Sequence, residues 1–176
     1  MTLYSDLTQD EQQLLRRSLQ AAAVAVSAAS LGRPEETVSE GFAAASVILE
    51  RRPQDLANPL VSSLVLELET EVREGRAFPD YVEAASAEGA RARALETLQA
   101  LVAMLEARVS PDEAAATKAW FMRIAEAVAA AGREDQGFLG RGGVQVNDAE
   151  RSELEEIASV LGITGTDAAA GPTDVS

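Results

Sequence analysis

The sequence predicts a single all-α domain, a bundle of about five to seven helices, and three observations support this prediction. Apolar residues recur at spacings of three and four along most of the chain, which is the period of one helix face. Helix start and stop signals separate these segments. The composition is 47% hydrophobic but only 4% aromatic, with much alanine, which favours closely packed helices. We expect the bundle to span residues 1–163 and residues 164–176 to be a disordered tail.

A capping box and two prolines predict the first two helices. Thr8 and Glu11 match the S/T-x-x-E capping box, so the first helix should begin there and run to about residue 30. Its buried face is expected to contain Leu15, Leu19, Ala22, Ala23 and Val26. Pro34 suits the first position of a second helix, which Pro53 ends. The expected apolar face of this second helix is Val38, Phe42, Ala45 and Leu49.

Asn58 followed by Pro59 predicts the start of a third helix. Its expected buried residues are Leu60, Val61, Leu64, Val65 and Leu68. Because its first turns are unusually apolar, we expect this helix to lie at the centre of the bundle. Glu67, Glu71 and Glu74 share one side of its second half, which we interpret as a face exposed to water.

The chain from residue 80 to residue 109 is again helical in pattern, and it forms either one helix or a short helix and a longer one divided at Ser86 and Gly89. Its expected buried stripe is Leu95, Leu98, Val102 and Leu105. Tyr81, which precedes this stripe, is expected at the core or its edge.

Two further helices complete the prediction. Ser110, Pro111 and Glu113 combine a cap, a first-position proline and a capping-box acid. The apolar face of that helix is Trp120, Phe121, Ile124 and Val128. Asn147 caps the last helix, and Gly162 ends it. The last helix is expected to bury Leu154, Ile157, Ala158 and Leu161.

The charge and the missing residue types exclude several classes of function. The chain has 15 basic and 29 acidic residues, a net charge of −14, which disfavours nucleic acid as a partner. It has no cysteine and no histidine, which excludes disulfides, thiolate chemistry, Ser-His-Asp catalysis and the usual zinc sites. No apolar run approaches the roughly 20 residues of a membrane span, and no signal peptide is evident. We therefore expect a cytoplasmic protein.

The glycine-rich segment at residues 132–147 is longer than most connections between helices, and three interpretations stay open. Phe138 and Leu139 insert into the bundle as a packed lid, or Phe138 is an anchor for a partner protein or a second copy. Alternatively, backbone amides near Gly142 and Gly143, with Arg141 beside them, bind an anion.

Acidic residues crowd the start of the last helix. Asp148, Glu150 and Glu153, followed by Glu155 and Glu156, are the candidate ligands for calcium or magnesium. The alternative is that these acids only complement the helix dipole and cap. A carboxylate-based enzyme is a third hypothesis, but we expect the acids to lie on polar faces, where their pKa values would not be shifted.

Residues 120–162 contain an alanine-rich helical segment, a glycine-containing connection and a second amphipathic helical segment. RIAEAVAAAG is followed by VQVNDAERSELEEIASVLGI. The positions that fit a V-x-x-x-E-x-x-x-L-x-x-I-A-x-x-L-G pattern are Val146, Glu150, Leu154, Ile157, Ala158, Leu161 and Gly162. In this pairing the segment resembles the tellurite-resistance TerB family. The resemblance implies an all-α bundle and an auxiliary, non-enzymatic role in stress response, with acidic metal sites and protein partners at the membrane. The family's Asp-Gly turn, which supplies its metal ligands, is replaced here by Gly143 and Val144.

From these observations we expect a non-catalytic helical interaction module without a bound cofactor. Its expected partner is another protein or a second copy of the chain. A divalent-metal-binding protein is the main alternative, and a carboxylate-based enzyme is the second.

Overall fold

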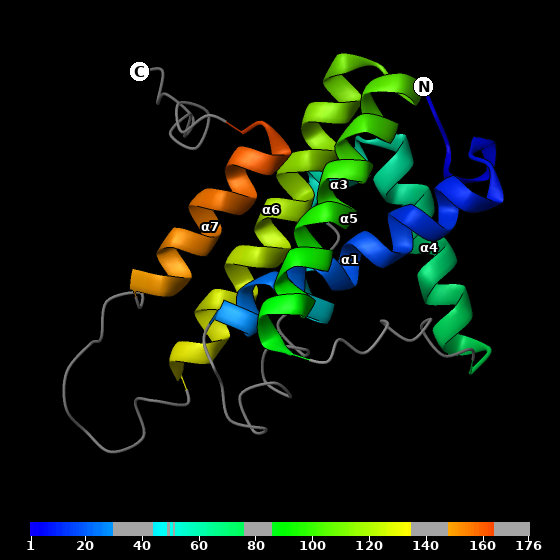
Figure 1. Cartoon of the computed structure of the whole chain (residues 1–176). Helices are drawn as coiled ribbons and strands as arrows, with labels where there is room; N and C mark the ends of the chain where they lie inside the picture. The colour runs from blue at the N-terminus through cyan, green and yellow to red at the C-terminus, as the bar shows by residue number, and fades with distance from the viewer. Residues whose placement is uncertain (30–43, 49, 51, 76–85, 135–147, 164–176) are drawn as a thin grey trace, which may run out of the picture.

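The computed structural model describes residues 1–29, 44–48, 50, 52–75, 86–134 and 148–163 (Figure 1). A 3-10 helix, η1 (Tyr4–Asp6), precedes α1 (Gln9–Ala29), and residues 44–48 are also helical. The next elements are the short α3 (Pro53–Leu56) and α4 (Pro59–Arg73). Three long helices follow: α5 (Ala87–Arg108), α6 (Pro111–Glu134) and α7 (Asp148–Leu161). These described segments contain no strand, so the predicted all-α bundle is confirmed.

The predicted caps at Thr8, Asn58 and Ser110 are formed by the expected side chains, while the predicted cap Asn147 lies outside the described residues. The Thr8 amide donates to Glu11 Oε2 at 2.8 Å, and the Glu11 amide donates back to Thr8 Oγ1 at 3.4 Å. Asn58 Oδ1 accepts the first free amides of α4, from Leu60 at 3.1 Å and Val61 at 3.4 Å. These bonds satisfy backbone donors that a helix start leaves unpaired, which is why the helices begin where the sequence predicts.

The centre of the bundle is α1, not α4 as the sequence suggested. α1 packs against α5 over much of its length and also contacts α6 and α7. The main contacts of α4 are with η1, α3 and α6, and Figure 1 shows it beside the bundle. Most of its apolar residues fill one face, while Leu66 on the opposite face and Val72 near the C-terminal end of the helix are each 58% exposed. The prediction was wrong because a high apolar content does not require burial on all sides.

The core joins residues from η1 and every long helix. Trp120 and Phe121 are its largest fully buried side chains, and their rings meet edge to face at 5.4 Å between centroids. On α5 three residues of the predicted stripe are buried and Val102 is half-buried, while Leu101 and Met104, which were not predicted, are buried too. The reason is that α5 contacts α1, α6 and α7 and therefore buries more than one side.

The register of the second predicted helix was wrong at its C-terminal end. Ala45, expected on the apolar face, is exposed, whereas Ala44 and Ile48 are buried. The earlier part of that helix, Tyr81 and the tail at residues 164–176 lie outside the described residues. In the parts of the chain that are described, no helix is long and apolar enough to cross a membrane.

Candidate functional site

Among the described residues, three carboxylates are buried in the helical bundle, and an arginine from another helix pairs with each. Glu71 on α4 is 6% exposed and accepts two bonds from the Arg16 guanidinium on α1, one at 2.5 Å from Nη1 to Oε1. The Tyr4 hydroxyl lies near this pair, and burial raises the Tyr4 pKa against the opposing effect of Arg16. The expectation that Glu71 faces water was therefore wrong.

The second buried carboxylate is Glu153 on α7, which is 3% exposed. Its Oε2 accepts a bond from Arg91 Nε on α5 at 2.5 Å, and Arg91 also pairs with Glu156. Burial raises the pKa of the Glu153 carboxyl, outweighing the lowering by Arg91. Its other oxygen, Oε1, has no hydrogen-bond partner in the part of the chain that the structure describes. The expectation that no acid would have a shifted pKa was wrong at this position.

The third is Asp55 on α3, which pairs with Arg123 on α6. Close by, Asn58 Nδ2 donates to Thr117 Oγ1 at 3.0 Å and to the Glu113 carbonyl at 3.1 Å. The cap of α4 is thus also a contact with α6. The three arginine–carboxylate pairs join α1 to α4, α5 to α7 and α3 to α6, so each holds a different pair of helices together.

The structure describes only part of the predicted metal site. Asp148 and Glu150 lie at the start of α7, but their side chains are outside the described residues. Glu153 is the member that can be placed, and its carboxylate faces Arg91. Within the described segments, no three acidic side chains are grouped so that they could hold a metal ion. The glycine-rich loop residues Phe138, Leu139, Arg141, Gly142 and Gly143 also lie outside the described residues.

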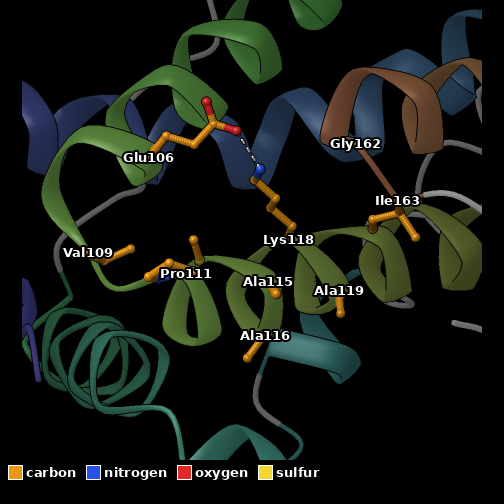
Figure 2. A pocket seen from close by; sticks show the side chains of 10 residues that line it. Glu106, Val109, Pro111, Ala115, Ala116, Lys118, Ala119, Gly162 and Ile163 are labelled. Carbon is orange, nitrogen blue, oxygen red and sulfur yellow. Dashed lines mark hydrogen bonds and ion pairs between the residues drawn. The ribbon is translucent and has the colours of Figure 1, made fainter.

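A groove of about 560 Å³ opens where the connection from α5 to α6 meets the end of α7 (Figure 2). Its lining is Glu106, Val109, Pro111, Ala114, Ala115, Ala116, Lys118, Ala119, Gly162 and Ile163. Eight of these ten residues are apolar or glycine, and Lys118 is the one cation among them. We call this feature the Lys118 groove.

Two local features place Lys118 in the groove. Its ammonium bonds to Glu106 Oε1 at 3.0 Å across the turn between α5 and α6. Gly162 ends α7 with φ of +69°, and the amide of Ile163 bonds back to the Ala158 carbonyl at 2.9 Å. A Cβ atom on Gly162 would lie 4.0 Å from Lys118 Nζ, so the ammonium lies against the C-terminal end of α7. The negative end of a helix dipole favours a cation there.

Sequence reasoning missed the Lys118 groove. Three separate segments contribute to it, and periodicity describes each helix only by itself. A usable signal was present, because the only lysine of the chain follows closely after three consecutive alanines near the start of α6.

The sequence matches no family model, and neither the curated proteins nor the solved structures include a match.

Proposed function

We propose that this chain is a non-catalytic helical interaction module and that the Lys118 groove is its binding surface. The observation that supports this most is the groove itself. Its volume of about 560 Å³ falls in the range of roughly 300–1,000 Å³ found for ligand sites. Mostly apolar walls with one polar group that fixes orientation are also typical of such sites.

The positions of the buried carboxylates, each paired with an arginine, support a non-catalytic role. Carboxylate catalysis requires two acids at one cleft with separated pKa values. The three buried carboxylates that the structure describes join three different pairs of helices, and none of them lines the Lys118 groove. Their arrangement suits a scaffold whose helices are held in register by ion pairs.

The shape of the groove suits an apolar group. Ala115, Ala116 and Ala119 are exposed on α6, and their small side chains leave space beside the helix. The opposite side of α6 bears Trp120, Phe121 and Ile124 in the core, so the helix backbone is held in place. A preformed wall of this kind reduces the entropy lost on binding.

The test is to fill the groove without disturbing the core. Ala115→Phe places a ring in the groove, and Ala100→Phe is the matched control on an exposed site of α5 outside it. A panel of small apolar compounds with neutral, anionic and cationic heads is screened by saturation-transfer NMR. We expect compounds that bind the wild type and Ala100→Phe but not Ala115→Phe. If no compound binds, or if Ala115→Phe binds them equally well, the proposal is wrong.

A further inference from the structure

The Lys118 groove combines apolar walls with a single positive charge. We infer that its ligand is a small apolar carboxylic acid, of the fatty-acid class, whose carboxylate pairs with Lys118 while its tail lies along Ala115 and Ala119. This inference rests on the proposed function and names the chemical class of the ligand for that groove.

The ammonium of Lys118 has capacity for a second partner. It has three donors, and its bond to Glu106 Oε1 uses one of them. Among the described residues, no other hydrogen bond from this ammonium is present. A ligand carboxylate that reached Nζ would therefore find unused donors in a largely apolar setting, where a charge-assisted bond is strong.

The partner that now holds Lys118 is easily displaced. The Lys118 side chain is only 14% exposed, whereas the Glu106 side chain is 63% exposed. Ion pairs with an exposed member contribute little to stability, because water competes with them. Glu106, which Figure 2 shows paired with Lys118, can turn into solvent at small cost and leave the ammonium to a ligand.

The same asymmetry selects the charge of the ligand. The Lys118 side chain is largely enclosed and its partner Glu106 is largely exposed, so a head group seated in the groove would lie beside a positive charge. The rest of the chain has the opposite sign, with a net charge of −14, and would repel an anion elsewhere on the surface. Anion binding is therefore expected to be local to this groove.

The experiment compares three probes with the same tail: decanoate, decanol and decyltrimethylammonium, each below its micelle concentration. Because Lys118 is the only lysine, ¹³C-lysine labelling of the full chain gives one side-chain ε signal that reports directly on the groove. We expect decanoate to shift this signal and to bind about tenfold more tightly than either other probe, as suits one charge-assisted bond.

Two substitutions test whether the charges of Lys118 and Glu106, rather than the shape of the groove alone, determine how tightly decanoate binds. Lys118→Gln should weaken decanoate binding about tenfold while leaving decanol binding unchanged. Glu106→Gln removes the internal competitor and should tighten decanoate binding by about threefold. Glu96→Gln is the matched control, since it removes the same charge from an exposed site of α5 outside the groove, and it should leave decanoate binding unchanged.

The outcomes distinguish this inference from the proposed function. If decanol and decyltrimethylammonium bind as tightly as decanoate, with binding blocked by Ala115→Phe, the groove binds apolar ligands but the inferred ligand class is wrong. If none of the three probes binds, the inference is wrong, and the wider compound panel decides the proposed function. If Lys118→Gln fails to fold, the comparison of the three probes on the wild type still decides.

Discussion

Single residues account for the largest differences between the predicted and the observed protein. Glu71 was expected to face water because it lies in a row of glutamates on α4. The row defines a helix face correctly, but it contains no information about which helix lies opposite. Arg16 from α1 pairs with Glu71 on that face, and Glu71 is buried between the two helices. Tertiary pairing of this kind cannot be derived from the period of one helix.

Loss of the Glu71 charge should destabilise the fold. Glu71→Gln leaves the Arg16 guanidinium, whose side chain is 16% exposed, without its counter-ion. Breaking a buried pair by removing one partner typically costs several kcal/mol, and we expect a decrease of about 3 kcal/mol in the free energy of unfolding. Urea denaturation measures it, with the exposed Glu96→Gln expected within about 0.5 kcal/mol of the wild type. Equal effects of the two substitutions would show that the pair is not important for stability.

Glu153 predicts a pH dependence. Its pKa is raised in the folded protein, so the folded state holds this proton more tightly than the unfolded state. The stability that it contributes is therefore present below the ordinary glutamate pKa of 4.5 and is lost as the pH rises through the higher folded value. Its charged neighbours are Arg91, which lowers this pKa, and Glu156, which raises it.

Glu153→Gln resembles the protonated form at every pH and should remove this trend. We expect the stability of the wild type to decline relative to Glu153→Gln as the pH is raised from 4.5 to about 7. Denaturation curves at several pH values measure the difference. Glu155→Gln, an exposed acid on the same helix, should keep the wild-type trend. A constant difference between the wild type and Glu153→Gln would contradict the prediction.

Whole helices were predicted better than single residues, because their starts depend on local chemistry. The capping boxes at Thr8 and Ser110 and the Asn58 cap involve residues three positions apart or fewer, and all three form as expected. The position of a helix within the bundle depends on distant contacts instead. For this reason α4 was assigned to the centre that α1 occupies.

Asn58 should contribute more than an ordinary cap. Asn58→Ala removes the acceptor for the first amides of α4 and also the two Nδ2 bonds to α6. A cap alone is worth about 1 kcal/mol, and the loss of further buried bonds should bring the total to roughly 2–3 kcal/mol. Thermal or urea unfolding of Asn58→Ala measures this, and Ser110→Ala at an exposed capping box is expected to cost about 1 kcal/mol. If the two variants lose the same stability, the contact with α6 contributes nothing.

At the scale of the whole molecule, the all-α bundle follows from the sequence, whereas the Lys118 groove does not. The fold class depends on periodicity and caps, which agree along the chain. The groove arises where the end of α5, the start of α6 and the end of α7 meet, and this meeting is set by packing of the whole bundle. The resemblance to the TerB family, the role of Phe138 and the metal ligands at Asp148 and Glu150 stay predictions.

Because Lys118 is the only lysine of the sequence, lysine-specific reagents can be used to study the groove selectively. Acylating reagents that modify lysine side chains have a single target in this sequence, and that target is largely enclosed by the groove walls. The extent of acylation at Lys118 itself, read by mass spectrometry of its peptide and kept separate from acylation of the exposed Met1 amine, therefore becomes a footprint of groove occupancy. Any molecule that fills the groove would slow this reaction, whatever its identity, so footprinting offers a route from a mixture of metabolites to the natural ligand.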